Sequence, residues 1–315
     1  MEIIPLWLRH RPQRARTERR ASMEQHVSAR RDRPDTGEPT IAVAFGGGGA
    51  RGLAHIHVIE ALDEMGIRPL AIAGSSIGAI MGAGMAAGMT GREIRDYTLA
   101  TVGNRGEVLN RLWQLRPNSL SEAVSSGFRF GQFNIERVLK AFLPEAIPAR
   151  FSDLLIPLKV TATDYYGQTE RICESGDLHK AIAASCALPA IFMPVKIEGR
   201  VMIDGGMYNP IPFDHLRALA DIVIAVDVVG GPDGDGKTIP SRIDSLFGAS
   251  QLMMQSIIAM KMKAGAPDIL LRPDVGRFRA LDFLRAREVL AATASTSDQL
   301  KRALSERIDQ WQAGR

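Results

Sequence analysis

Two short apolar runs early in the chain each end in a glycine-rich turn that opens into a helical stretch. The first run, residues 41–45, leads into four consecutive glycines, and the second, residues 70–73, leads into Gly74-Ser75-Ser76-Ile77-Gly78. Strand, turn and helix therefore follow one another twice in the same order. Such a βαβα beginning predicts an α/β fold with a mostly parallel central sheet covered by helices.

The same patterns predict further elements. Strands are expected at residues 158–166, 170–173, 195–197, 201–203, 222–228 and 269–271, and helices at residues 53–65, 213–220, 242–264 and 286–313. Residues 104–150 mix aromatic side chains with arginines and glycines, a composition that suits ordinary helical packing or a lid over an apolar site. The methionines of residues 242–264 favour core packing over a lipid-binding groove.

Length and composition suit one large domain or two small ones. The chain has 315 residues, of which 45% are apolar, enough for a substantial core. Cys173 and Cys186 have neither a metal-ligand nor a C-x-x-C spacing, so we expect two reduced, buried thiols in a reducing compartment. No apolar run approaches the roughly 20 residues that span a bilayer.

The net charge of +4 is concentrated at the start of the chain. Residues 1–38 hold nine arginines and six acidic residues, which is +3 and leaves +1 for the other 277 residues. Between Arg9 and Arg33 there is no apolar periodicity, so we expect a disordered, solvated tail. Contact with anionic lipid headgroups or nucleic acid is the functional alternative, and Met23 is an alternative start.

The segment from Gly74 to Gly78 has the G-x-S-x-G pattern of a nucleophile elbow. A serine at the apex of a strand-to-helix turn has a strained backbone, and glycines two residues away on either side relieve the crowding. The N–H groups of the new helix favour a developing oxyanion near the serine. Ser76 is therefore the candidate nucleophile, although so short a pattern also occurs by chance.

The glycine run of residues 46–49 allows two interpretations. With Ala50, Arg51 and Gly52 it contains G-x-G-x-x-G, as in a dinucleotide-binding turn. However, the next strand ends in the elbow and not in an acidic residue that could bind a ribose. Adjacent glycine N–H groups also suit an oxyanion hole, which we favour.

Asp204 is the candidate base. It ends an apolar strand, and Gly205 and Gly206 behind it let another backbone or a substrate approach closely. Partial burial would raise its basicity, so that it could take the Ser76 proton directly. An ordinary turn aspartate is the structural alternative. Of the six histidines, only His215 follows the later acidic candidates, as a Ser, Asp, His order requires; we expect all six to be structural or on the surface.

In motif, order and spacing the chain resembles the bacterial patatin-like phospholipase family. The resemblance covers roughly residues 40–230 and rests on residues 46–52, the elbow around Ser76, the segment Ala184-Ser185-Cys186-Ala187-Leu188-Pro189-Ala190 with Pro194, and Asp204-Gly205-Gly206. It implies a three-layer α/β/α core and a Ser-Asp dyad without a catalytic histidine. We accordingly expect an arginine-rich tail (1–38), a catalytic core (39–230) and a C-terminal helical segment packed on the same domain (231–315).

The resemblance also implies residue roles. Ser76 would be the nucleophile and Asp204 the base, and the N–H groups around Gly47, Gly48 and Gly49 would form the oxyanion hole. Arg51 would fix the glycine loop. The supporting positions are Gly52, Gly74, Ile77, Gly78, Gly205 and Gly206, and Thr163-Asp164 would have a structural role.

The implied activity is hydrolysis of fatty-acyl ester bonds in phospholipids or lysophospholipids through an acyl-serine, with neither a metal nor an organic cofactor. The expected partner is a lipid or acyl-ester substrate and no specific nucleic acid. We expect a cytoplasmic protein with peripheral contact at the inner membrane face. Two alternatives stay open: an acyltransferase or non-phospholipid carboxylesterase using the same dyad, and a non-catalytic protein that binds membrane or nucleic acid.

Overall fold

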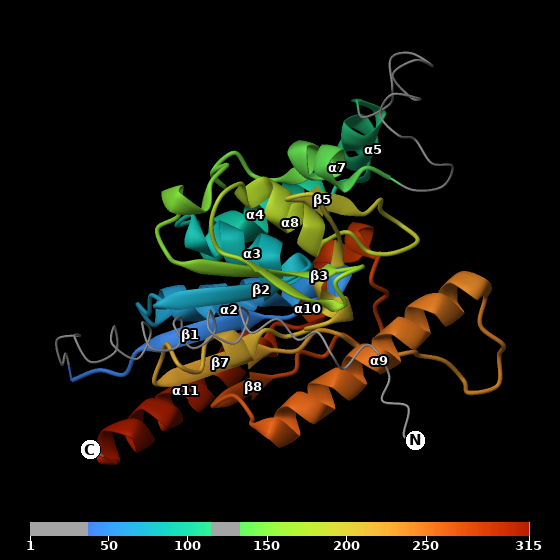
Figure 1. The fold of residues 1–315 in the computed structure, drawn as a ribbon. Helices are drawn as coiled ribbons and strands as arrows, with labels where there is room; N and C mark the ends of the chain where they lie inside the picture. Colours follow the sequence, from blue (N-terminus) through green and yellow to red (C-terminus); the bar gives the residue numbers. More distant parts are fainter. Residues whose placement is uncertain (1–36, 115–132, 315) are drawn as a thin grey trace, which may run out of the picture. The chain divides into compact units, whose positions relative to one another are not determined.

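In the computed structural model, the described residues, 37–114 and 133–314, build a central sheet from eight strands (Figure 1). The strands are β1 (Ile41–Phe45), β2 (Ala71–Ser75), β3 (Leu158–Asp164), β4 (Thr169–Cys173), β5 (Val195–Ile197), β6 (Arg200–Asp204), β7 (Ile222–Val226) and β8 (Ile269–Leu271). Their order is β5-β6-β3-β2-β1-β7-β8, with β4 paired to β3. The pairings among β3, β2, β1, β7 and β8 are parallel, and those of β4, β5 and β6 are antiparallel. The sheet is therefore mostly parallel, as predicted.

Helical elements cover both faces of the sheet, which confirms the predicted three-layer α/β/α fold. The first face carries α2 (His55–Glu64), α3 (Ile77–Ala86), α4 (Gly91–Thr101), α5 (Arg105–Gln114), α7 (Ile135–Phe142), α8 (Leu178–Ser185), α10 (Ala286–Ala292) and α11 (Ser295–Ala313). The second face is covered by α9 (Arg242–Ala264) and the short 3-10 turn η5 (Phe213–His215). Figure 1 shows α3, α4 and α8 across the sheet from α9.

Side-chain size separates the two faces of the central strand β1. Val43 and Phe45 point into the larger core, which the first group of helices completes. Ala42 and Ala44 point into the smaller core and pack beside Phe213. Successive side chains of a strand point to opposite faces, so this alternation places the bulky residues under the helices and leaves room for η5 on the other side.

Most predicted elements are confirmed, and the differences have local causes. The expected helix over residues 286–313 divides into α10 and α11, because the backbone of Thr293 leaves the helical region, with φ −104° and ψ 10°. The expected helix over residues 53–65 begins only at His55, because residues 49–54 wind as the 3-10 helix η2 (Gly49–Ala54). Only one 3-10 turn forms in the predicted helical run of residues 213–220.

From Pro39 onward the described residues form one compact unit. The part after residue 230 contributes α9, β8, α10 and α11 to it. Residues 1–36 of the expected tail, and residues 115–132 of the expected lid or packing segment, lie outside the described residues. Among the described helices, none is both long enough and apolar enough to cross a bilayer.

Candidate active site

Ser76 lies at a sharp turn between β2 and α3. Its backbone has φ 54° and ψ −125°, a conformation that residues other than glycine rarely adopt. A Cβ on Gly74 would lie 2.5 Å from the carbonyl oxygen of Gly78, and a Cβ on Gly78 would lie 2.1 Å from that of Phe45. Both positions therefore require glycine, which is the crowding expected at a nucleophile elbow.

Strands β2 and β6 end at neighbouring positions along one edge of β3. Ser75 at the end of β2 pairs with Thr161, and Asp204 at the end of β6 pairs with Ala162, the next residue of β3. Because β2 runs parallel to β3 and β6 runs antiparallel, their carboxyl ends face each other. The hydroxyl of Ser76 donates a hydrogen bond of 2.7 Å to Asp204 Oδ2.

Asp204 is buried and hydrogen-bonded, with 3% of its surface exposed. Its Oδ1 accepts the N–H of Gly206 at 2.7 Å, and its carbonyl oxygen accepts the hydroxyl of Thr163 at 2.9 Å. A Cβ on Gly205 would lie 2.2 Å from a carbonyl oxygen of β3, so this turn also requires glycine. Burial raises the pKa of Asp204 to about 6, although the hydrogen bonds from Ser76 and Gly206 oppose the shift.

Thr163 and Asp164 have the contacts of structural residues. Thr163 supports the backbone of Asp204, as described above. The Asp164 carboxylate accepts the N–H of Gly167 at 2.9 Å and lies 3.0 Å from the guanidinium of Arg200. Both residues therefore fix the end of β3, beside which Ser76 and Asp204 meet.

The three glycines of the expected oxyanion hole differ in what their N–H groups do. Gly47 donates its N–H to the carbonyl of Pro210 at 2.9 Å, so this donor is already used, contrary to the prediction. Gly47 instead provides space beside Ser76. A Cβ added to Gly47 would lie 3.3 Å from the Cβ of Ser76. The N–H groups of Gly48 and Gly49 have no acceptor among the described residues. These two remain the candidate donors to an oxyanion.

The shape of the glycine loop depends on close backbone contacts. A Cβ on Gly48 would lie 2.3 Å from the carbonyl oxygen of Val228. Gly49 has φ 62°, and a Cβ there would lie 2.1 Å from the carbonyl oxygen of Ala280. A Cβ on Gly52 would lie 2.3 Å from Cγ2 of Ile77. The loop is thereby wedged between α3 and two later segments of the chain.

Two buried side chains anchor this loop. Arg51 donates from Nε to the carbonyl of Phe278 at 2.6 Å and from a terminal nitrogen to that of Val229 at 2.7 Å. Its burial lowers the pKa of the guanidinium, and nearby Asp282 opposes the shift. His55 donates from Nε2 to the carbonyl of Gly46 at 2.9 Å, and its burial lowers its pKa to about 4. The imidazole is therefore neutral at physiological pH and serves as a loop anchor.

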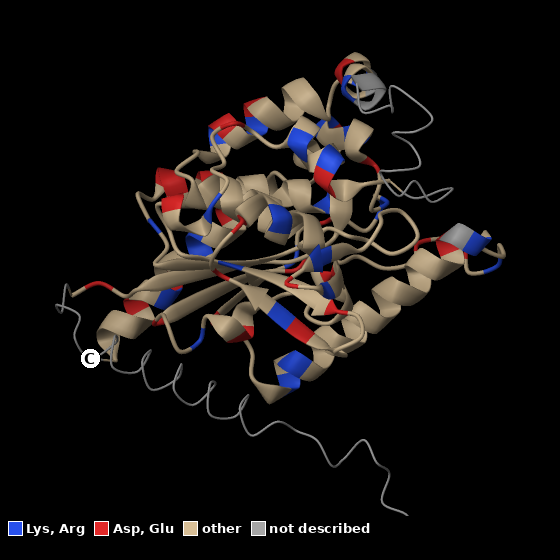
Figure 2. Cartoon of the chain, turned by 45° about the horizontal axis from the view of Figure 1, so that its top comes forward, with Lys and Arg blue, Asp and Glu red and all other residues tan. Residues whose placement is uncertain are grey.

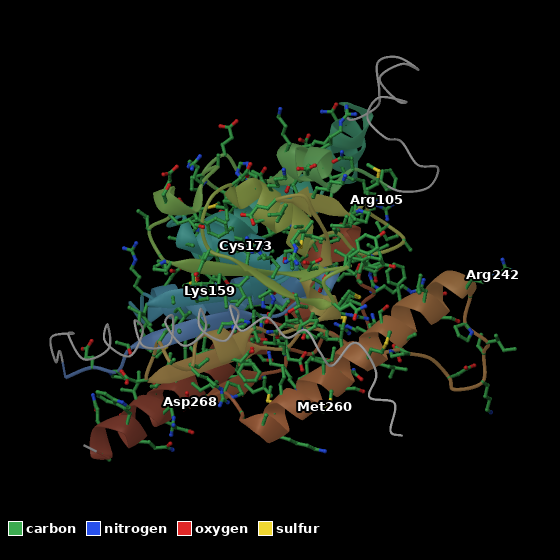
Figure 3. All side chains as sticks on the ribbon, in the orientation of Figure 1. Arg105, Lys159, Cys173, Arg242, Met260 and Asp268 are labelled. Atoms are coloured by element: carbon green, nitrogen blue, oxygen red, sulfur yellow. The ribbon has the colours of Figure 1, made fainter. Side chains whose placement is uncertain are left out.

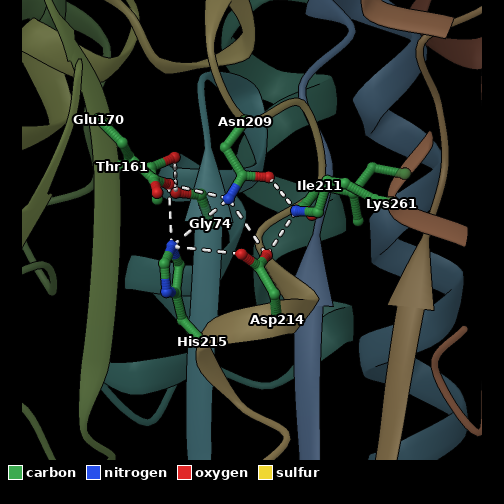
Figure 4. A network of polar contacts seen from close by, with 8 residues as sticks. All are labelled: Gly74, Thr161, Glu170, Asn209, Ile211, Asp214, His215 and Lys261. Atoms are coloured by element: carbon green, nitrogen blue, oxygen red, sulfur yellow. Dashed lines mark hydrogen bonds and ion pairs between the residues drawn. The ribbon is translucent and has the colours of Figure 1, made fainter. Parts of the chain in front are cut away.

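His215 lies in a polar network together with a lysine of α9 (Figure 4). Its Nε2 is 2.9 Å from Glu170 Oε1. The Asn209 amide donates to Glu170 at 2.8 Å and to Asp214 at 3.1 Å. The ammonium of Lys261 bonds both Asn209 and Asp214. His215 thus contacts this network and not Ser76, in keeping with the structural role expected for it.

Three side chains of this network, from Glu170, Asp214 and His215, carry potential metal ligands within 4.8 Å of one another. Lys261 already supplies the positive charge that the cluster requires, so the contacts are those of an ion-pair network. The network fixes the segment that follows Asp204. The side chain of Asn209 lies in the network, and its backbone N–H donates to the carbonyl of Gly205 at 2.9 Å.

The other described histidines also bond to main-chain carbonyls. Besides His55, His57 bonds to Leu290 at 2.9 Å and His179 bonds to Ile147 at 3.1 Å. Within residues 37–114 and 133–314, no histidine is hydrogen-bonded to Ser76. These contacts agree with structural roles for the described histidines, while positions 10 and 26 lie outside the described residues.

An apolar cavity of about 480 Å³ adjoins the hydrogen-bonded pair of Ser76 and Asp204. Ser76, Asp204 and the glycine loop line it, together with the buried thiol of Cys186. Both cysteines are free and buried, as predicted, and burial raises the pKa of the Cys186 thiol. Two groups of elements form the remaining walls: α3, α4, α5 and α7 in one group, and α9 with residues 280–284 in the other.

Comparison with known proteins identifies the family. A profile described as patatin-like phospholipase matches residues 43–217, more than half of the chain. The chain belongs to the patatin-like phospholipase family. An uncharacterized NTE family protein of Mycobacterium tuberculosis is 34% identical over 200 residues, covering 63% of this chain and 52% of the relative. Human patatin-like phospholipase domain-containing protein 6 is 33% identical over 218 residues, covering 66% of this chain and 14% of that protein.

This patatin-like chain therefore spans about half the length of the mycobacterial relative and a smaller part of the human one. Among solved structures, VipD from Legionella pneumophila aligns with a TM-score of 0.43 at 14% identity, covering 83% of this chain and 67% of that one.

One residue at the site of this patatin-like chain, Ser185, has a contact that its sequence motif does not indicate. The hydroxyl of Ser185, at the end of α8, accepts the backbone N–H of Ser76 at 2.8 Å and is fully buried. This bond stabilises the strained backbone of the elbow. The signal was present in the segment Ala184-Ser185-Cys186, which supported the family resemblance without indicating a contact. Residue spacing could not show that α8 ends beside the elbow.

Proposed function

We propose that this protein is a serine acyl hydrolase that cleaves fatty-acyl esters of phospholipids or lysophospholipids through a Ser76-Asp204 dyad. The observation that carries the proposal is the 2.7 Å hydrogen bond from the hydroxyl of Ser76 to the buried carboxylate of Asp204, formed at a strained elbow. Membership of the patatin-like phospholipase family supports a lipid ester as the substrate.

The proposed reaction has two stages. As Ser76 Oγ attacks the acyl carbonyl, Asp204 accepts the hydroxyl proton, and the N–H groups of Gly48 and Gly49 stabilise the tetrahedral oxyanion. Collapse breaks the ester C–O bond, the leaving alcohol takes the proton from Asp204, and an acyl-serine remains. Asp204 then removes a proton from water, which attacks the acyl carbonyl. Asp204 returns this proton to Ser76 Oγ as the Oγ–acyl bond breaks and the fatty acid is released. The pKa of Asp204, about 6, leaves the carboxylate ionised and basic near neutral pH.

The exposed face of α9 supports peripheral contact with a lipid surface. Leu246, Met253 and Met260 recur every seven residues and are 48%, 60% and 63% exposed. Residues 245–260 contain no charged residue, and Figure 2 shows the helix in tan between its charged ends. Figure 3 labels Arg242 and Met260 toward the two ends of this helix. We propose a cytoplasmic protein that uses this face at the membrane.

The decisive experiment compares three variants on a p-nitrophenyl acyl ester and on a phospholipid. We expect Ser76→Ala and Asp204→Asn to lose activity by about a thousandfold or more, since each removes a member of the catalytic pair. His215→Ala should retain activity, because its contacts lie in the structural network. Labelling by a fluorophosphonate should disappear in Ser76→Ala.

The outcomes separate the alternatives. Full activity of Ser76→Ala would refute the proposal, and a His215→Ala protein that is folded but inactive would indicate a triad. Adding an alcohol or lysolipid acceptor distinguishes an acyltransferase, which would form a new ester. A non-phospholipid esterase would hydrolyse only the p-nitrophenyl ester. A non-catalytic binding protein would hydrolyse neither substrate and would not react with the fluorophosphonate.

A further inference from the structure

One face of α3 continues from the elbow into the apolar cavity. Ile77, Ile80, Met81 and Gly84 have the spacing of a single helix face, and all four line the cavity together with Ser76. With a rise of 1.5 Å per residue, Gly84 lies about 12 Å along the helix from Ser76. The cavity wall thus extends away from the nucleophile along the helix that Ser76 begins.

The walls that face α3 close this part of the cavity. They come from α4 and α7, where the lining residues Ile94, Thr98 and Leu139 are no more than 6% exposed. No lining residue from α3, α4 or α7 is charged. A long apolar group could therefore be buried here without leaving a charged group desolvated.

The other group of walls has a different character. Ser250 and Gln251 of α9 bring polar side chains to the cavity. Leu281 and Leu284 also line it, yet they are 48% and 47% exposed, so this part reaches the protein surface. A polar leaving group is better accommodated on this side, because it can remain solvated there.

We propose that the acyl chain of the ester lies along α3 and that Gly84 sets the chain length that fits. This inference rests on the proposed function and adds the orientation of the substrate. A fully extended chain would reach Gly84 after about nine or ten carbons. A Cβ on Gly84 would lie 3.1 Å from Cδ1 of Ile94 and 3.8 Å from the sulfur of Met89. A larger side chain is blocked on that side by α4 and must extend into the cavity.

The test measures kcat/KM on p-nitrophenyl esters from butyrate to palmitate for the wild-type protein and Gly84→Leu. We expect butyrate hydrolysis to change by less than about threefold, because the short chain ends before Gly84. Hydrolysis of laurate and palmitate should fall by at least about tenfold, which is the effect of displacing two methylene groups from an apolar site. Val138→Phe narrows the same region from α7 and should give the same pattern.

Ser250→Leu is the matched control, since it adds a leucine at the α9 wall of the same cavity. It should leave the dependence on chain length unchanged. The proposal is overturned if Gly84→Leu and Val138→Phe both hydrolyse butyrate with an unaltered chain-length profile, or if Ser250→Leu produces the shortened profile instead. A wild-type protein that hydrolyses none of these esters would contradict the proposed function, and a wild-type protein limited to butyrate would contradict the long apolar subsite alone.

Discussion

Two residues 128 positions apart meet because two strands end face to face on β3. Neither Ser76 nor Asp204 has an unusual local sequence, and each pattern occurs by chance in other chains. What distinguishes the pair is its surroundings. The serine has a backbone conformation supported by Ser185, and the carboxylate is removed from solvent.

The raised pKa of Asp204 predicts opposite effects of pH on activity and stability. Activity should rise with pH through about 6, because only the ionised carboxylate can accept the serine proton. In the folded protein the pKa of Asp204 is about 6, above its ordinary value near 3.8. The stability that protonated Asp204 contributes is therefore fully present below pH 3.8 and is lost as the pH rises through about 6. At pH 8, Asp204→Asn should therefore increase the free energy of unfolding, by up to about 3 kcal/mol, while abolishing activity.

Urea unfolding at pH 5 and pH 8, together with a pH profile of kcat/KM, checks this prediction. Asp153→Asn removes a carboxylate that is exposed to solvent and is the matched control, with a change in stability below about 0.5 kcal/mol. The same change in the free energy of unfolding at pH 5 and at pH 8 for Asp204→Asn would contradict the assigned cause, which is desolvation of the charged form.

At the scale of the element, α9 shows why composition alone misjudged a helix. Its residue range was predicted correctly, and its methionines were expected to pack in the core. Met254 is buried and Met262 packs against the smaller core, but Met253 and Met260 are largely exposed. Apolar residues surround so much of this helix that periodicity could not identify which side the sheet would cover.

The exposed side of α9 predicts a separation between surface binding and catalysis. Replacing Leu246, Met253 and Met260 together by serine should lower binding to phosphatidylcholine vesicles by at least about tenfold, since three large apolar side chains no longer enter the lipid interface. Hydrolysis of a soluble p-nitrophenyl ester should stay unchanged, because none of the three lines the cavity.

Vesicle co-sedimentation and the soluble ester assay measure these two effects. Replacing the exposed Ser245 and Ser256 of the same helix by alanine provides a control that should keep vesicle binding. If the triple variant binds vesicles as well as the wild type, α9 is not the contact. A change from dimer to monomer in the triple variant would instead indicate that a second copy covers this face.

At the scale of the whole molecule, later segments hold the early motifs in place. Arg51 bonds to the backbone at residues 229 and 278, and Lys261 bonds to the segment that follows the dyad. The catalytic core expected to end at residue 230 thus depends on contacts from beyond that boundary. The polar network of Figure 4 joins α9, β4 and η5 around Asn209.

Lys261→Met is predicted to destabilise the protein by about 1 to 2 kcal/mol, because it leaves the buried amide oxygen of Asn209 without its donor and removes the ion-pair partner of the more exposed Asp214. Lys263→Met, two residues along the same helix at an exposed position, should change the free energy of unfolding by less than about 0.5 kcal/mol. Urea unfolding of both variants is the measurement. Equal effects would show that the network contributes little beyond a surface charge.

The fold class, most strand and helix ranges, and the candidate roles of Ser76, Asp204 and the glycine loop could be predicted from the amino-acid sequence. These depend on local signals: apolar runs, glycine turns and the order of motifs along the chain. Three properties became visible only in the folded chain: which N–H groups of the glycine loop have no acceptor among the described residues, the hydrogen bond from Ser76 to Ser185, and the exposed side of α9. Those properties depend on contacts between residues far apart in the sequence, such as Gly47 with Pro210, whose separation no local pattern encodes.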